Sequence, residues 1–163
     1  MTDHEHYMHI ALEEAERGAG EGNVAVGSIL VRGERVVARG RNLVNSTSDP
    51  TAHAETVALR HAGEQLGYTD FSELTLYTTF EPCPMCCGAI LASGVHTLVM
   101  GARHNLAQSR WGAYTVERLL DLTSCAGQLT VITGVLTQAC ADCLLYTSPS
   151  PRDVEESRMP SSA

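Results

Sequence analysis

Four side chains in two short segments are of types that could do chemistry together. His53 and Glu55 stand two residues apart, and Cys83 and Cys86 form a Cys-x-x-Cys pair. A Cys-x-x-Cys pair that opens a helix places both sulfurs on one face, close enough to bind one ion. One imidazole and two thiolates leave a fourth tetrahedral position open, which is typical of catalytic rather than structural zinc. We therefore predict one Zn²⁺ per subunit, bound by His53, Cys83 and Cys86.

Glu55 shares this predicted site without having to be a ligand. A carboxylate there can take a proton from zinc-bound water and pass it to a leaving nitrogen. Zinc lowers the pKa of its water from about 15.7 to about 7, which makes a hydroxide nucleophile available at neutral pH. The arrangement suits attack on an amidine-like ring carbon followed by loss of ammonia. We therefore predict a hydrolytic deaminase with Glu55 as the catalytic residue.

Each motif has a plainer alternative when it stands alone. A Cys-x-x-Cys pair can be a redox pair or a structural zinc site, and a His-x-Glu occurs often by chance. Together, with Pro82 directly before Cys83, they match the zinc-deaminase signature of His-x-Glu followed by Pro-Cys-x-x-Cys. A structural site would be closed by a fourth ligand. The spare Glu55 therefore argues against a non-catalytic, zinc-folded partner subunit.

The elements that must position these residues follow from hydrophobic periodicity and turn residues. Helices are predicted over 6–18, 52–66, 84–93 and 115–122 and from about 137, and strands over 24–31, 35–43, 74–79, 95–100 and 129–135. Polar loops are expected at 45–50 and 101–114. This order predicts an α/β fold with one sheet and helices packed on it.

Composition limits the classes of partner. The chain has 163 residues and a net charge of −8, and all its basic residues are Arg. Binding a polyanion usually draws on clustered positive charge. The densest basic group is small and lies on the predicted hairpin, at Arg32, Arg35, Arg39 and Arg41. A long nucleic-acid partner is therefore predicted to be unlikely.

The ends of the chain and the remaining cysteines add further expectations. No apolar run is long enough for a membrane span, and the N-terminus lacks a signal peptide, so we expect a cytoplasmic protein. A deaminase domain is predicted over 1–145. The segment 146–163 contains two Ser-Pro pairs and is predicted to be a disordered tail that resembles a non-native read-through end. Cys87, Cys140 and Cys143 are expected to be buried core residues.

The motifs resemble those of the cytidine deaminase superfamily. Asp49-Pro50-Thr51-Ala52-His53-Ala54-Glu55 and Glu81-Pro82-Cys83-Pro84-Met85-Cys86 are similar, almost letter for letter, to one branch of it. That branch holds bacterial tRNA adenosine deaminases, guanine deaminases and fungal-type cytosine deaminases, and the resemblance runs from about Tyr7 to Leu144. It implies a three-layer α/β/α sandwich with a five-stranded mixed sheet, and a homodimer.

The resemblance also implies substrate-binding roles for five residues. Asn42 would hydrogen-bond the base, Val26 would lie against its ring, and the backbone N–H of Ala54 would contact the substrate. His104 and Trp111 fall in the loop after the fourth strand, where such enzymes shape the mouth of the site. The alternatives are a turn residue for Asn42, a plain core residue for Val26, and surface positions for the two loop residues.

Departures from the branch bear on the substrate. Residues 104–112 replace the Lys/Gly/Ala/Ser-rich stretch of the tRNA-editing enzymes, and the basic C-terminal helix of those enzymes is missing. With the acidic net charge, these departures favour a small-molecule substrate: a free nucleobase, nucleoside or related aminated heterocycle of cytosine or guanine type. The narrowing effect of Trp111 favours pyrimidines slightly. The alternative is a tRNA wobble-adenosine deaminase that forms inosine.

Overall fold

The fold is built on one mixed β-sheet. In this computed structural model, which describes residues 3–147, the strand order is β2-β1-β3-β4-β5. β1 pairs antiparallel with β2 and β3, whereas β3, β4 and β5 are parallel. The strands are β1 (Gly27–Arg32), β2 (Arg35–Arg41), β3 (Thr75–Phe80), β4 (Thr97–Ala102) and β5 (Thr130–Ile132).

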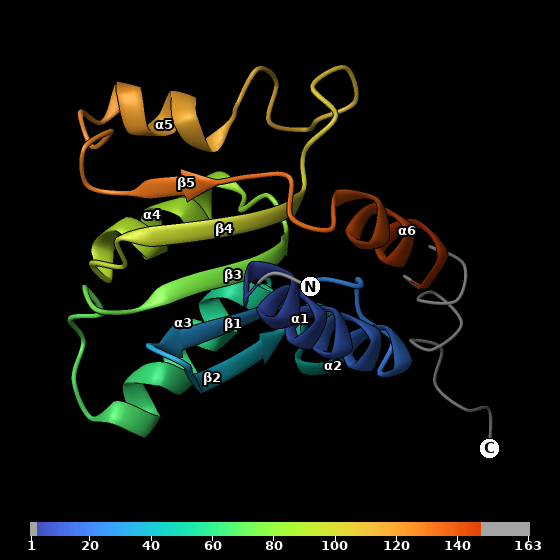
Figure 1. The fold of residues 1–163 in the computed structure, drawn as a ribbon. Helices are drawn as coiled ribbons and strands as arrows, with labels where there is room; N and C mark the ends of the chain where they lie inside the picture. Colours follow the sequence, from blue (N-terminus) through green and yellow to red (C-terminus); the bar gives the residue numbers. More distant parts are fainter. Residues whose placement is uncertain (1–2, 148–163) are drawn as a thin grey trace.

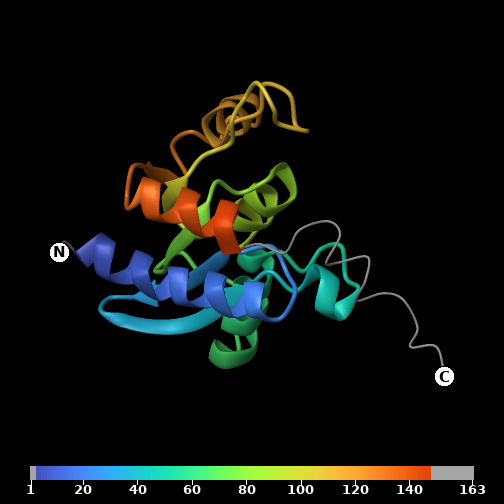
Figure 2. The ribbon, with the colours of Figure 1, turned by 90° about the vertical axis from the view of Figure 1, so that its right-hand side faces the viewer.

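Helices cover both faces of this sheet (Figures 1 and 2). α1 and α6 lie side by side on one face and enclose a core cluster that includes Met8, Ile29 and Val99. α3 and α4 cover the other face, over a second cluster that includes Leu76 and Ile90. The helices are α1 (Asp3–Gly20), α2 (Val44–Thr47), α3 (Ala54–Leu66), α4 (Pro84–Ala92), α5 (Val116–Leu122) and α6 (Thr137–Thr147). The predicted three-layer α/β/α sandwich is confirmed.

The boundaries differ from the predictions in a few places. The one-turn helix α2 overlaps the predicted loop at 45–50, and the fifth strand is only Thr130–Ile132. α6 continues to Thr147, two residues past the predicted end of the domain. The predicted disordered tail otherwise falls on 148–163, outside the described residues, and stays a prediction.

Close packing of α3 on β2 depends on Gly40. A Cβ atom at this position would lie 2.4 Å from both the carbonyl oxygen of Ala54 and the nitrogen of Ala58. No side chain fits at such distances, because backbone atoms cannot move aside as a flexible side chain can. Gly40 therefore lets the first turn of α3, which carries Glu55, rest directly on the sheet.

One edge of the sheet collects the chain segments that carry the predicted site. β2, β3 and β4 run in the same direction, so their carboxyl ends meet at this edge. They are followed by Asn42, Glu81 and Arg103. Val26 comes just before β1 at the same edge, where its carbonyl accepts a hydrogen bond from the Asn42 N–H (3.1 Å). Ligands of open α/β sheets bind at this kind of edge.

The predictions for the other cysteines are confirmed, since Cys87, Cys140 and Cys143 are buried. Cys140 packs where β4 has Gly101, because a Cβ atom there would lie 2.3 Å from the Cys140 sulfur. Within residues 3–147, no helix is both long and apolar enough to cross a membrane.

Candidate active site

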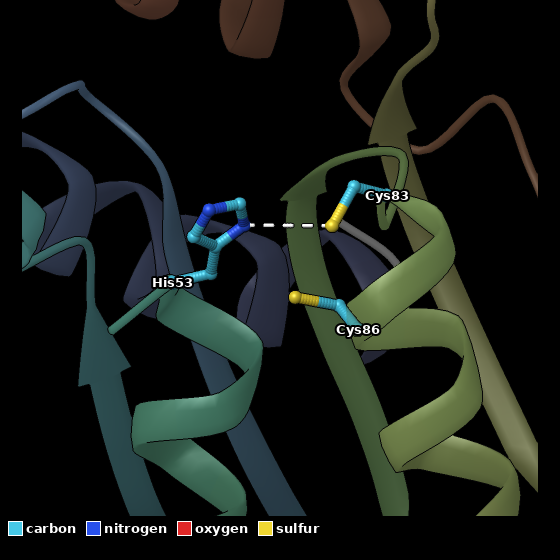
Figure 3. A group of neighbouring side chains, drawn as sticks. All are labelled: His53, Cys83 and Cys86. Carbon is cyan, nitrogen blue, oxygen red and sulfur yellow. Dashed lines mark hydrogen bonds between the residues drawn. The ribbon is translucent and has the colours of Figure 1, made fainter. Parts of the chain in front are cut away.

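His53, Cys83 and Cys86 converge from the beginnings of two helices (Figure 3). Their ligand atoms all lie within 4.8 Å of one another, and His53 Nδ1 is 3.5 Å from Cys83 Sγ. Zinc binds nitrogen at about 2.0–2.1 Å and sulfur at about 2.3 Å, so tetrahedral geometry separates the two ligand atoms by about 3.5 Å. The donor set and its spacing therefore fit a zinc ion with a fourth position open.

The helix starts explain how these side chains come together. His53 is the N-cap residue of α3 and Cys83 that of α4, and both have extended backbone angles. An N-cap side chain usually accepts a hydrogen bond from its own helix, but neither residue makes such a bond. Both side chains are thus available to a metal ion, and the positive ends of both helix dipoles favour thiolate at the site.

The two thiols differ in acidity in the absence of metal. A hydrogen bond from the Cys86 thiol, with a further one involving His53, lowers the pKa of Cys83 to about 4. The same hydrogen bond and burial raise the pKa of Cys86. A hydrogen bond to Cys83 raises the pKa of His53. Hydrogen bonding at the site thus favours the thiolate form of Cys83, which is the form that binds a cation.

Glu55 lies in the first turn of α3, buried beside the three ligands, with only 3% of its surface exposed. Burial raises the pKa of its carboxyl group. The Thr78 hydroxyl, on β3, donates a hydrogen bond to Glu55 Oε1 at 3.0 Å. A buried carboxyl with a raised pKa and a fixed orientation is suited to accept and return a proton.

A cavity of about 510 Å³ opens in front of this cluster. Its volume is within the range of about 300–1,000 Å³ found for small-molecule sites. Cys86 is fully buried and is not among the residues that line the cavity. The other residues predicted from the sequence all line the cavity: Val26, Asn42, His53, Ala54, Glu55, Cys83, His104 and Trp111.

The structure shows which side-chain atom of Asn42 is already engaged in a hydrogen bond. Its side-chain Oδ1 accepts a hydrogen bond from the Val44 N–H at 3.1 Å, which is a turn contact. Asn42 is thus both a turn residue and a cavity residue, and a hydrogen bond to a base would come from its Nδ2.

His104 and Trp111 reach the cavity from the long loop between β4 and α5, which is yellow in Figure 1. The His104 ring packs edge-on against Phe80, with centroids 4.7 Å apart. Its Nε2 is buried and, among the described residues, has no hydrogen-bond partner. Arg110 Cζ lies 4.4 Å from the centroid of the Trp111 ring. Both loop residues are half-buried and line the cavity, and their part in binding stays a prediction.

Three neighbouring residues were missed by sequence reasoning. Thr78 orients Glu55, Glu81 lines the cavity and bonds to the loop after β4, and Arg110 is the basic residue in the lining. Glu81 stands directly before the Pro-Cys motif, which was an available signal. Nothing in the sequence distinguishes Arg110 or Thr78 from other surface or strand residues.

Fold and site together define a zinc-dependent deaminase of the cytidine deaminase-like class. Residues 1–102 match the family described as the cytidine and deoxycytidylate deaminase zinc-binding region. The chain belongs to this family, which confirms the resemblance and the predicted zinc.

Relatives and solved structures narrow the comparison. The chain is 36% identical over 145 residues to a tRNA-specific adenosine deaminase of Bacillus subtilis, covering 88% of each chain. It is 45% identical over 112 residues, or 68% of its length, to the chloroplastic tRNA(adenine(34)) deaminase of Arabidopsis thaliana, of whose length the match spans only 9%.

A structure from a study of A-to-I editing by tRNA:A34 deaminases superposes with a TM-score of 0.77 at 34% identity, covering 85% of this chain and 99% of that one. A guanine deaminase from Nitrosomonas europaea gives 0.76 at 28% identity, covering 86% and 81%.

The predicted small-molecule substrate is wrong. Relatives from five organisms at 34–45% identity are tRNA-specific or tRNA(adenine(34)) adenosine deaminases. The prediction relied on the net charge of the whole chain, which averages over surfaces remote from the site, and on loop residues that differ from those of relatives. The same relatives weigh against the accompanying prediction that a long nucleic-acid partner is unlikely.

Proposed function

We propose that this protein deaminates adenosine to inosine at the wobble position of tRNA. The observation that carries the proposal is the match over 88% of the chain to a tRNA-specific adenosine deaminase, in a chain that retains the zinc ligands and Glu55. The predicted cytoplasmic location and homodimer go with this proposal. Light scattering should give the mass of two chains.

The reaction adds the oxygen of water at C6 of adenine and releases the amino group as ammonia. His53, Cys83 and Cys86 would hold the zinc ion, which would act as a Lewis acid and lower the pKa of a water molecule to about 7. Glu55 takes a proton from the water and returns it to the leaving nitrogen. The Thr78 hydroxyl holds one carboxylate oxygen, Oε1, and so fixes the orientation of the carboxyl group for this transfer.

The base would be bound by residues that line the cavity. Asn42 would donate from Nδ2 to a ring nitrogen, the Ala54 N–H would bind the base edge, and Val26 would pack against the ring. A base inside an RNA cannot reach such a cavity while stacked, so the nucleotide must be turned out of its stack. An anticodon loop already exposes its bases, which lowers the cost of this step.

The test is inosine formation in an adenosine-containing tRNA anticodon stem-loop, alongside ammonia release from a panel of free bases and nucleosides that includes guanine. We expect inosine in the RNA and little turnover of the panel. Efficient turnover of a free base without inosine in the RNA would overturn the proposal. Glu55→Ala protein serves as the inactive control.

A further inference from the structure

Positive charge is scarce around the cavity. Arg110 is the one Arg in its lining, beside the acidic residues Glu55 and Glu81. Of the eleven arginines in the chain, the group predicted on the β1–β2 hairpin is mostly neutralised: Arg32 pairs with Glu73, and Arg39 and Arg41 pair with Glu14.

Arg110, in contrast, makes no ion pair with a carboxylate of the described residues. Its side chain is exposed, and its guanidinium group stacks over the half-buried Trp111 ring at 4.4 Å. A stacked guanidinium loses less freedom when it binds a partner, and it keeps its N–H donors at the rim of its plane. The pair thus presents an oriented, uncompensated cation at the mouth of the cavity.

The loop that carries the pair is tied to the active-site wall. The Tyr114 hydroxyl donates a hydrogen bond to the carbonyl oxygen of Pro82 at 2.6 Å. Inside the loop, the Trp111 N–H donates to Ser109 Oγ at 3.1 Å, and the Tyr114 N–H donates to the Trp111 carbonyl at 3.2 Å. These bonds hold Trp111 relative to the residue next to Cys83, so the cation has a defined position beside the site.

We propose that Arg110, held by stacking on Trp111, binds the RNA phosphate backbone beside the nucleotide whose base enters the cavity. The inference rests on the proposed function, because it requires a polynucleotide substrate. A nucleotide turned into the cavity leaves its flanking phosphates at the mouth, where Arg can bind a phosphate through two parallel N–H donors. A chain with net charge −8 repels RNA overall, so one free cation at this place has a large effect on binding.

The experiment compares Arg110→Gln with Arg35→Gln. Arg35 is an exposed residue at the opposite end of β2 from Asn42, so it is the matched loss of one positive charge away from the cavity. Inosine formation in an anticodon stem-loop is measured at several salt concentrations. RNA affinity is measured separately by fluorescence anisotropy with each change placed in the inactive Glu55→Gln chain. Circular dichroism checks that each variant is folded.

For Arg110→Gln we expect KM to rise on the order of tenfold with kcat little changed. The dependence of log kcat/KM on log salt should become shallower by about 0.7–1, the value for one lost phosphate contact. Arg35→Gln should have the same KM and the same salt dependence of kcat/KM as the parent. Trp111→Leu should give part of the Arg110→Gln effect, because it leaves the charge but removes its support.

The possible failures are distinct. If the parent forms inosine but Arg110→Gln keeps the parental KM, affinity and salt dependence, the inference is overturned and the proposed function stands. If the parent forms no inosine but Arg110→Gln weakens RNA binding with a shallower salt dependence, the proposed function fails and the RNA contact stands. If the parent neither edits nor binds the RNA, both are overturned.

Discussion

The Glu81 carboxylate accepts a hydrogen bond from the backbone N–H of His104, with 3.2 Å between nitrogen and Oε1. Its Oε2 accepts from the Val116 N–H at 3.4 Å and from the Arg103 guanidinium. One buried side chain therefore holds both ends of the loop that reaches over the cavity. Because Glu81 lies two residues before Cys83, the loop and the zinc site share an anchor.

Glu81→Gln should loosen this loop while leaving the zinc ligands in place. Loss of a buried charge that accepts several hydrogen bonds should lower the free energy of unfolding by about 2 kcal/mol. KM for the RNA should rise more than kcat falls. Glu117→Gln is the control, since Glu117 also pairs with Arg103 but is 45% exposed and should cost less than about 1 kcal/mol. An equal decrease in the free energy of unfolding and an equal rise in KM in the two variants would contradict the anchoring role.

Glu55→Gln should remove the proton transfer without disturbing the metal. We expect kcat to fall by about 10²–10⁴-fold, the usual contribution of general acid–base catalysis, with zinc content unchanged. Thr78→Val removes only the hydroxyl that orients Glu55 and should give a smaller loss. Single-turnover inosine formation and metal analysis are the measurements. A Glu55→Gln protein with near-parental kcat would exclude Glu55 as the proton carrier.

Substitution of Cys86 should weaken zinc binding, whereas substitution of its neighbour Cys87 should not. Both thiols are buried, but Cys87 is outside the group whose ligand atoms meet. Loss of a residue that only hydrogen-bonds a metal ligand lowers metal affinity by about 10–100-fold. Loss of the ligand itself in Cys86→Ala should therefore lower zinc affinity by more than this. Cys87→Ala should retain one zinc per chain. Competition with a chromophoric chelator measures both, and equal zinc affinity in the two variants would be inconsistent with the assigned ligands.

Gly40→Ala should destabilise the protein through the contact between β2 and α3. The added methyl group would meet backbone atoms at 2.4 Å, and such overpacking costs about 1–3 kcal/mol. A decrease in Tm of about 2–12 °C is expected, with weaker zinc binding because His53 is the N-cap residue of α3. Gly20→Ala is the control, since nothing lies within 4 Å of a Cβ atom there. A Gly40→Ala protein as stable as Gly20→Ala would contradict the close approach.

The short motifs predicted the reaction site because zinc chemistry depends on local spacing. Residues at a helix start have nearly fixed relative positions, so the spacing of Cys83 and Cys86 is enough to place them on one helical turn. The same holds for His53 and Glu55. Hydrophobic periodicity likewise predicted the sheet and the main helices, and it missed only short elements such as Val44–Thr47, in which few residues carry a pattern.

The substrate could not be predicted from short motifs or from hydrophobic periodicity. Net charge is a sum over the whole chain. It hides the ion pairs that neutralise Arg39 and Arg41, and it hides that Arg110 has no carboxylate partner within residues 3–147. The averaged value led to the wrong prediction of a small-molecule substrate. Relatives over most of the chain corrected it.

The predicted zinc ligands, the predicted proton carrier and the order of the elements could therefore be read from the sequence, because each motif or element is made of residues a few positions apart. The meeting of Thr78 with Glu55, the anchoring of the long loop by Glu81 and the position of Arg110 at the cavity mouth were decided by the tertiary structure alone. The hydrogen bonds of Thr78 and Glu81 join residues separated by 23 positions. Only the packing of strands and helices brings such residues within hydrogen-bonding distance.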